Sequence, residues 1–476
     1  MDWTERLPPR QWVVRGVVLL LVVALLTPSV VSAITYNRNA ANLKPGTITH
    51  PVNGTTIISI QGYNVNGHGN KKKPARLVAV GPRGHVKWVY NGSKHGATWF
   101  YNVDPLPNGN LLVDSTEPGG TLVYELNPKT KKRVWKQYLP IKDTHDVHLI
   151  NNGTQLLVAH IRGYNKTTGK NNDGVFIYDL RKHKIVWRWY FRNYYKKSAG
   201  SSTYTHDWTH VNNVQQIAPG KFAVSVRNMD QVLVIDRKTK QVTMKLGQDG
   251  NSSILNHQHN PEYLQSKAGT PTFLVADSDN NRIVEYAKRG NHWKKTWQVG
   301  SSATLNWPRD ADRLPNGDTL IVDSVDQRVI QVTPKGKIVW EFYSPWLPYD
   351  AERIGTGNES HGSTMADLGN ESHGPTMADL NDSGTYNITG SANLNPGTGQ
   401  RFRMSVVLSN LFAGTSLQGK MRYYGARWDQ VTPFIRPVWM NEYAFVDAIV
   451  AILLVLLWFI GELVYQRKRI YRRVNT

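Results

Sequence analysis

A short turn-and-strand unit occurs four times along the chain and constrains its fold more than any other feature. The segment 106–113 reads Leu-Pro-Asn-Gly-Asn-Leu-Leu-Val, and variants of it return at 150–158, 217–224 and 314–322. Each copy predicts a strand, a tight turn at the glycine and a second strand. A repeat of roughly 45–55 residues built only from strands is typical of a β-propeller, in which each copy forms one four-stranded blade.

The repeats therefore predict an all-β fold, a six-bladed β-propeller over residues 45–345. The first blade is degenerate, and its clearer strands are expected at 56–61, 75–80 and 85–90. Most blades end on a strand that carries tryptophan, at Trp88, Trp135, Trp187, Trp297 and Trp340. We expect these indoles to pack between neighbouring blades, and stacking on sugars is the alternative.

Two apolar segments flank the repeats and predict membrane helices. Residues 16–37 follow a basic N-terminal stretch, 1–15, and residues 443–465 precede a basic tail, 466–476. Each segment is near the roughly 20 residues that a helix needs to cross a bilayer. The basic flanks place both termini in the cytoplasm and the propeller outside the cell. The first segment could instead be a cleaved signal peptide, since residues 31–33 fit a small-residue cleavage site, and the propeller would still be extracellular.

Composition narrows the classes of function. The chain has no cysteine, which excludes disulfides, thiolate catalysis and cysteine-based metal sites. The net charge of +22 is spread over many turns without a basic stripe or a nucleic-acid motif, so no nucleic-acid partner is expected, although the field favours anionic ligands. Nine Asn-X-Ser/Thr sequons predict a glycosylated cell-surface protein, at Asn53, Asn91, Asn152, Asn165, Asn251, Asn358, Asn370, Asn381 and Asn387.

The stretch 346–440 departs from the repeat. Residues 357–368 are duplicated almost unchanged at 369–380, which predicts an expanded polar loop. Each copy carries one histidine, at His361 and His373. These histidines could bind a metal, but a duplicated loop is the simpler interpretation, and no metal is expected. Residues 384–440 are expected to be β-rich and to lead into the C-terminal membrane helix.

Polar residues recur where each predicted blade begins. The position eight residues before the turn glycine holds Tyr101, His145, Asn212, His259 and Arg309, if a longer turn is allowed in blade five. The next position holds Asn or Asp, including Asn260, and His210 and His257 lie two residues upstream of the first set. A propeller gathers such positions around the mouth of its axial channel, where His, Asn and Arg suit the binding and polarising of an oxyanion. A structural role, in which side chains cap turns and bridge blades, is expected for Asp146, Asn213 and Asp310.

Three motifs resemble the arylsulfate sulfotransferases. They are Asp-Trp-Thr-His-Val-Asn at 207–212, the step Gln258-His259, and Asp-Ser-Asp-Asn-Asn-Arg at 277–282. The resemblance extends over residues 45–345, and the terminal apolar segments look like those of membrane-anchored archaeal members. It implies a six-bladed propeller that moves a sulfuryl group from aryl sulfates to phenols through a sulfohistidine, without a nucleotide donor or another cofactor.

The resemblance also implies roles for individual residues. His210 and His259 would hold or polarise the sulfuryl group and Arg282 would neutralise it, while the blade pattern alone adds His145 as a catalytic candidate. Substrate contacts are expected from Tyr101, Asn212, His257, Asn260 and Arg309.

One departure from the family pattern leaves the chemistry open. The family's nucleophilic histidine comes from the last part of the propeller, and residues 300–345 contain no histidine. Either His145, His210 or His259 serves instead, or the transferase reaction has been lost. The alternatives are a non-catalytic surface propeller that binds an anionic or glycan ligand in the same mouth, and an envelope scaffold that binds protein partners along its blade edges. A metal held by His257 and other histidines of the set is a weaker alternative, because acidic second ligands are few.

Overall fold

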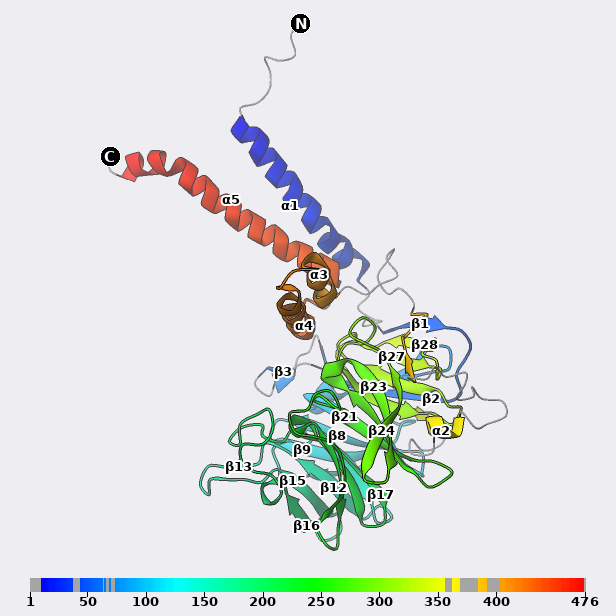
Figure 1. The fold of residues 1–476 in the computed structure, drawn as a ribbon. Coiled ribbons are helices and arrows are strands. Elements are labelled where there is room, and N and C mark those ends of the chain that lie inside the picture. The colour runs from blue at the N-terminus through cyan, green and yellow to red at the C-terminus, as the bar shows by residue number, and fades with distance from the viewer. Residues whose placement is uncertain are drawn as a thin grey trace. The chain divides into compact units, whose positions relative to one another are not determined.

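The chain divides into two compact units, one made of residues 42–399 and the other of residues 1–41 together with 400–476. The computed structural model describes residues 10–36, 43–62, 64–65, 68–69, 73–355, 362–368, 384–391 and 403–474. The strands belong to the first unit and the long helices to the second (Figure 1).

Within the described residues, six antiparallel sheets form the blades of a propeller, which confirms the predicted fold class (Figure 1). The innermost strands of blades two to six are β7 (Trp99–Pro105), β11 (Val147–Ile150), β17 (Val211–Ala218), β21 (His259–Gln265) and β25 (Pro308–Arg313). Successive innermost strands from β11 to β25 contact one another. The residues at which these strands begin are therefore brought together from distant parts of the sequence.

Three further strands complete each of these blades in chain order. Blade two adds β8 (Leu111–Glu117), β9 (Gly120–Leu126) and β10 (Arg133–Tyr138). Blade three adds β12 (Gln155–His160), β15 (Gly174–Asp179) and β16 (Lys184–Tyr190), and blade four adds β18 (Lys221–Val226), β19 (Gln231–Asp236) and β20 (Val242–Gly247). Blade five adds β22 (Pro271–Asp277), β23 (Arg282–Arg289) and β24 (His292–Val299), and blade six adds β26 (Thr319–Asp323), β27 (Arg328–Val332) and β28 (Ile338–Tyr343).

Blade one is assembled from both ends of the propeller sequence. Its outer strands are β2 (Thr55–Ile60), β5 (Arg76–Val80) and β6 (Val86–Asn91), close to the three strands expected there. Its innermost strand is β29 (Pro348–Ile354), which pairs antiparallel with β2. The propeller thus continues past the predicted boundary at residue 345. No hairpin turn signals β29, because its pairing partner lies at the other end of the propeller sequence.

Short elements decorate the blades. A fifth strand joins blade six as β1 (Lys44–Ile48) and blade five as β30 (Thr385–Tyr386). Two small hairpins are formed by β3 (Asn64–Val65) with β4 (His68–Gly69) and by β13 (Tyr164–Asn165) with β14 (Lys170–Asn171). Four 3₁₀ turns are η2 (Gly92–His95), η3 (Phe191–Asn193), η4 (Arg227–Met229) and η5 (Ser278–Asn280).

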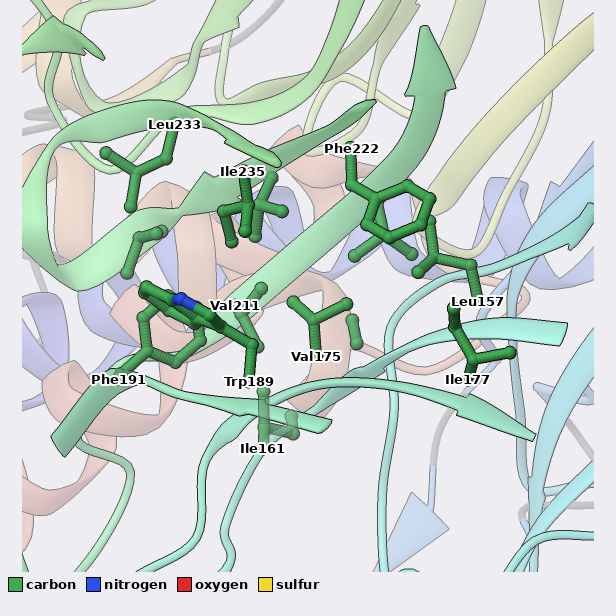
Figure 2. Close-up of a cluster of buried hydrophobic side chains, with 14 of the residues drawn as sticks. Leu157, Ile161, Val175, Ile177, Trp189, Phe191, Val211, Phe222, Leu233 and Ile235 are labelled. Atoms are coloured by element: carbon green, nitrogen blue, oxygen red, sulfur yellow. The ribbon is translucent and has the colours of Figure 1, made fainter. Parts of the chain in front are cut away.

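Hydrophobic side chains fill the spaces between neighbouring blades, and the tryptophans pack there as predicted. Figure 2 shows one such cluster, which combines Ile177 and Trp189 of blade three with Phe222 and Ile235 of blade four. Trp187 packs against the same cluster, and its indole nitrogen donates to the carbonyl of Arg237 at 3.0 Å. The indole nitrogen of Trp297 likewise donates to Pro334 of the next blade at 2.8 Å. At these two places a tryptophan packs between blades and also donates one hydrogen bond to the next blade.

Part of the predicted polar loop packs against the propeller. The helical turn α2 (Met365–Leu368) lies in the first copy of the duplicated segment, and Met365 and Leu368 are buried in a core cluster of blades five and six. The backbone nitrogen of Lys267 donates to Asp367 at 3.1 Å. The two histidines of the duplication, His361 and His373, lie outside the described residues.

The other unit contains two helices that are long and apolar enough to cross a membrane, α1 (Arg10–Thr35) and α5 (Glu442–Val474). Their candidate spans are Gln11–Thr35 and Glu442–Arg467, in agreement with the two predicted membrane segments. Polar contacts join the two helices at both ends. Arg15 pairs with Glu462 at one end, and Asn441 donates to Ser32 at 3.0 Å at the other. The helices therefore pair in an antiparallel sense.

The prediction of a β-rich segment at 384–440 is wrong for most of that stretch. Apart from the two residues of β30, its regular elements within the described ranges are the helices α3 (Met404–Leu411) and α4 (Gln418–Ile435). Asp429 of α4 accepts hydrogen bonds from the backbone nitrogens of Met404 and Ser405, at 2.8 and 3.1 Å, and so caps the N-terminus of α3. Tertiary capping of this kind overrides the strand preference of the valine and tyrosine pairs in the segment.

Candidate active site

Two positions, two residues apart, recur at the start of every innermost strand. The upstream position holds Trp99, Asp143, His210, His257, Trp307 and Leu347, and the downstream position holds Tyr101, His145, Asn212, His259, Arg309 and Tyr349. In four blades the upstream residue has a positive φ, at His210 (44°), His257 (48°), Trp307 (55°) and Leu347 (54°). This conformation is uncommon for residues with a side chain and is often found at functional sites.

Side chains from both positions meet in one cluster of aromatic and imidazole rings. The His145 ring stacks on Tyr101 with 4.3 Å between ring centroids, and the His210 ring lies 4.6 Å from that of His145. Tyr349 lies 5.3 Å from Tyr101, 5.9 Å from His145 and 6.2 Å from His259. The geometry thus brings together three of the four predicted catalytic residues and the predicted contact residue Tyr101.

Guanidinium groups accompany these rings. The Arg309 guanidinium lies 4.3 Å from the Trp307 ring centroid and 5.1 Å from that of Tyr349. Arg227, in the turn η4, is the second cation, and its positive charge acts on both His210 and His259. We call this set the rim cluster, and its members are Tyr101, His145, His210, Arg227, His259, Arg309 and Tyr349.

The three imidazoles of the rim cluster are neutral near pH 7. Burial, followed by the charge of Arg227, lowers the pKa of His210 from 6.5 to about 4. Burial, then Arg309 and Arg227, holds the pKa of His259 well below its ordinary value, and burial also lowers that of His145. Each ring therefore offers a nitrogen lone pair at neutral pH.

The tautomer of His210 is fixed by a carboxylate. Its Nδ1 lies 2.6 Å from an oxygen of Asp207. Burial opposes ionisation of Asp207, but the hydrogen bond with His210 and nearby positive charges keep its pKa below the ordinary value. Nδ1 must therefore carry the proton and donate it to Asp207, which leaves a lone pair on Nε2. With 12% of its side chain exposed, His210 remains accessible to a ligand.

The other two imidazoles differ from His210 in their partners. Nδ1 of His259 lies 2.8 Å from the hydroxyl of Ser278, which itself donates to the carbonyl of Pro308 at 2.7 Å. Both ring nitrogens of His145 are buried, and neither has a hydrogen-bond partner among the described residues. An unpaired buried polar group costs about 1–3 kcal/mol, so His145 marks a place where a polar ligand or water is expected.

The residues that follow the downstream position line the channel interior. Asn102, Asp146, Asn213, Asn260 and Asp310 are among the residues around a cavity of about 20 Å³. Asp146 accepts from the backbone nitrogen of Val214 at 2.6 Å, and Asp310 accepts from that of Ala351 at 3.2 Å. These contacts bridge blades, which confirms the structural interpretation of Asp146 and Asp310. Asn260 donates to Asp310 at 3.3 Å and so belongs to the channel rather than to the rim cluster.

Two other predicted contact residues have structural partners. The side-chain amide nitrogen of Asn212 donates to the carbonyl of Gln258 at 2.9 Å, and the backbone carbonyl of Asn212 accepts from the Tyr349 hydroxyl at 3.5 Å. Asn212 therefore links blades four and five. His257 is held outside the rim cluster between Asp279 and Ser201, with Nδ1 2.8 Å from Asp279 and Nε2 2.7 Å from the Ser201 hydroxyl.

Arg282 is engaged in a clamp within blade five. Its guanidinium donates to Asp277 at 2.7 Å, to Gln298 at 3.0 Å and to the carbonyls of Ser253 and Ile254. Blade six repeats this arrangement with Arg328, which donates to Asp323 at 2.7 Å. No hydrogen bond or ion pair within the described ranges joins Arg282 to the rim imidazoles. The geometry favours a structural role, and the catalytic role implied by the family resemblance stays a prediction.

Sequence reasoning missed two members of the rim cluster, Tyr349 and Arg227, and the supporting residue Arg162. A signal for Tyr349 exists, because Pro-Tyr-Asp-Ala-Glu-Arg at 348–353 parallels Pro-Arg-Asp-Ala-Asp-Arg at 308–313. Arg227 follows the end of β18 and Arg162 follows β12, so neither falls at a strand start. Arg162 pairs with Asp143 at 2.5 Å and approaches Asp207 at 3.7 Å, and it thereby supports the carboxylate that orients His210.

The fold and the rim cluster define a six-bladed propeller with an imidazole and guanidinium site at one end of its axis. The family model described as arylsulfotransferase (ASST) matches residues 58–296, half of the chain. The chain therefore belongs to the arylsulfotransferase family. No curated protein matches the sequence. No group of three or more His, Asp or Glu side chains in the described part of the chain is arranged to hold a metal ion.

Solved structures with a similar fold are remote. A protein of unknown function from Bacteroides caccae is 12% identical, with a TM-score of 0.44, over 63% of this chain and 98% of its own. A virginiamycin B lyase from Staphylococcus aureus is 11% identical, with a TM-score of 0.38, over 68% of this chain and 89% of its own. A hydrazine synthase from Kuenenia stuttgartiensis is 12% identical, with a TM-score of 0.34, over 54% and 70%. These similarities are too distant to carry functional information.

The low pKa of His210 predicts a specific loss of stability in acid. In the unfolded chain the His210 side chain binds a proton near pH 6.5, but in the folded site it does so only near pH 4. This group therefore costs the folded state no stability above pH 6.5, and stability is lost as the pH falls from 6.5 toward 4. The slope is about 1.4 kcal/mol per pH unit for one such proton. Asp143, whose pKa burial raises to about 6, acts in the opposite direction. We therefore expect the melting temperature of His210→Gln to fall less than that of wild type between pH 7 and 4.5. An equal fall in the two proteins would contradict the assignment.

Proposed function

We propose that this protein transfers a sulfuryl group from an aryl sulfate to a phenolic acceptor, with Nε2 of His210 as the nucleophile. The observation that carries the proposal is a neutral imidazole, oriented by Asp207, that lies within the field of Arg227 and beside a second neutral imidazole, His145. A neutral ring nitrogen is a competent nucleophile, and splitting the transfer into two steps lowers each barrier.

In the first half-reaction, Nε2 of His210 attacks the sulfur of the aryl sulfate. The N–S bond forms as the S–O bond to the aryl group breaks, and the electron pair leaves with the aryl oxide. The Nδ1 proton stays on the ring and strengthens its hydrogen bond to Asp207 as positive charge develops. An acidic phenol leaves as its anion, so this half-reaction needs no base.

In the second half-reaction, the acceptor oxygen attacks the sulfuryl group on His210. The new O–S bond forms, the N–S bond breaks, and its electron pair returns to Nε2. The acceptor loses its proton in this step. Throughout, charge is spread over three sulfuryl oxygens, and Arg227 and Arg309 supply the positive charge near His210 and His259 that would stabilise it.

The direct test uses the full-length protein in detergent or lipid nanodiscs. We expect release of nitrophenol from nitrophenyl sulfate that depends on an added phenol, together with formation of the sulfated phenol. Tight binding of inorganic sulfate with no release from any aryl sulfate would favour the second candidate, a non-catalytic propeller that binds anions. That candidate is kept because the last blade has no histidine and carries Arg309 at the rim instead.

We also propose that the protein is membrane-anchored, with the propeller outside the cell and both termini in the cytoplasm. The basic flanks of both helices support this orientation. The antiparallel contacts between α1 and α5, among them the Arg15–Glu462 pair, favour a retained anchor over a cleaved leader. We expect mass spectrometry of the membrane-purified protein to recover peptides from residues 1–30. A mature N-terminus near residue 33 would contradict this prediction.

A further inference from the structure

A second Asp–His pair lies next to the rim cluster, and it has no role in the proposed first half-reaction. Nδ1 of His257 lies 2.8 Å from Asp279, and Nε2 lies 2.7 Å from the hydroxyl of Ser201. These three residues come from separate segments: the loop before blade four, the start of blade five and the turn η5. The side chains of His257 and Asp279 are 22% and 24% exposed, so the group is open to a ligand.

The two Asp–His pairs share one neighbourhood. The charge of Arg227 acts on Asp279 and on Asp207. The backbone nitrogen of Ser201 donates to the carbonyl of Asn228 at 2.8 Å, and the Asn228 side chain donates to the carbonyl of Asp207 at 2.6 Å. His257 and His210 also occupy the same upstream position in successive blades, and both have a positive φ.

From this arrangement we infer that His257 is the general base that removes the proton of the phenolic acceptor. The inference rests on the proposed function and assigns the second half-reaction to a residue of its own. With Asp279 as acceptor for Nδ1–H, Nε2 of His257 holds a lone pair and accepts from a hydroxyl. In the structure the Ser201 hydroxyl lies against Nε2, and the hydroxyl of the acceptor would replace it there.

The proton and electron balance of the step is complete. The phenol oxygen forms its bond to sulfur as its proton moves to Nε2 of His257. The N–S bond on His210 breaks at the same time, and its electron pair returns to Nε2 of His210. The exposed side of His257 then releases the proton to water, so no further reactant is needed.

A base is needed most for acceptors that hold their proton tightly. Nitrophenols are already ionised near neutral pH, whereas alkyl phenols are not, so only the latter require His257. General base catalysis contributes about 10²–10⁴-fold. We therefore expect His257→Ala to lower kcat/KM by about 10²-fold or more for alkyl phenols and by under tenfold for nitrophenols, and Asp279→Asn to show the same pattern more weakly.

Rapid mixing of the full-length protein with nitrophenyl sulfate tests the two half-reactions separately. We expect the burst of nitrophenol in the His257→Ala variant to match that of wild type. His206→Ala is the matched control, because His206 is an exposed histidine of the loop that carries Ser201, and it should behave as wild type with every acceptor.

The possible outcomes separate this inference from the proposed function. An equal loss for all acceptors, or loss of the burst in the His257→Ala variant, would overturn the role of His257 while leaving sulfuryl transfer intact. Absence of a burst in wild type would overturn the proposed function itself, and the inference with it.

Discussion

Replacing His210 by alanine should abolish the release of phenol from aryl sulfates, with a fall in kcat on the order of 10³–10⁶-fold. The reason is that the substitution removes the nitrogen that accepts the sulfuryl group, while the guanidiniums that bind sulfate remain. KM for the donor should therefore change little. Steady-state assays over a range of nitrophenyl sulfate concentrations measure both parameters.

Asp207→Asn tests the carboxylate that orients His210, and its effect should be smaller than that of His210→Ala. The amide can no longer hold the Nδ1–H tautomer through a charged hydrogen bond, so we expect a fall in kcat of about 10²–10⁴-fold with the fold intact. His292→Ala, an exposed histidine on β24, is the matched control and should keep full activity. Activity within tenfold of wild type in the His210→Ala variant would remove His210 from the role of nucleophile.

Replacing Arg328 by alanine should destabilise the propeller by about 3–5 kcal/mol. The Arg328 guanidinium pairs with Asp323 at 2.7 Å and Glu341 at 2.9 Å, and all three side chains are almost fully buried. The substitution leaves two carboxylates buried without their cation, which is the costly half of breaking a buried ion pair. Denaturant titration of the purified protein, followed by tryptophan fluorescence, measures the change in the free energy of unfolding.

The equivalent change in blade five tests the role of Arg282. Its side chain is 15% exposed, so the loss of stability for Arg282→Ala should be smaller than for Arg328→Ala. If Arg282 is a clamp, the folded variant should keep kcat within about tenfold of wild type at low temperature, since structural and transition-state contacts separate in this way. A loss of activity in the folded Arg282→Ala variant comparable to that of His210→Ala would restore the catalytic role that the family resemblance implies. Arg289→Ala, at the exposed end of β23, should change stability by less than about 0.5 kcal/mol.

The architecture was accessible from the sequence because each blade carries its own local signal. The turn glycines and alternating strands at 106–113 and 314–322 are short-range features, and the propeller geometry follows from their repetition. The closing strand β29 is not followed in sequence by the strand with which it pairs, although its residues 348–353 parallel residues 308–313 of β25. Its pairing with β2 joins the two ends of the propeller sequence, so the hairpin pattern that marks the other blades is absent there.

The site was partly accessible for the same reason. A fixed offset from the turn glycine places Tyr101, His145 and His259 at equivalent points of different blades, and the structure brings them together. Arg227 could not be found in this way, because it lies in the turn η4 between β18 and β19. Arg282 shows the opposite difficulty: its motif resembles a catalytic signature, yet blade six uses the same spacing for a buried clamp at Arg328. The shared Asp–Arg spacing identifies a structural ion pair that is repeated in two blades. Only the surrounding contacts distinguish such an arginine from one that binds substrate.

The helices at 404–435 were missed because their stability is tertiary. Asp429 caps α3 from α4, and Gly425 allows the α3 backbone to approach, since a Cβ there would lie 2.4 Å from the Cα of Ser405. Neither feature is visible in the valine and tyrosine pairs that favour strands.

The location of the sulfuryl group during turnover distinguishes His210 from the other candidate nucleophiles. The full-length protein is incubated with an aryl sulfate in the absence of acceptor, quenched and digested, and the modified residue is located by mass spectrometry. We expect one sulfuryl group on His210, lost again when a phenol is added before quenching. A sulfuryl group on His145 or His259 instead, or turnover without any sulfated histidine, would contradict this assignment.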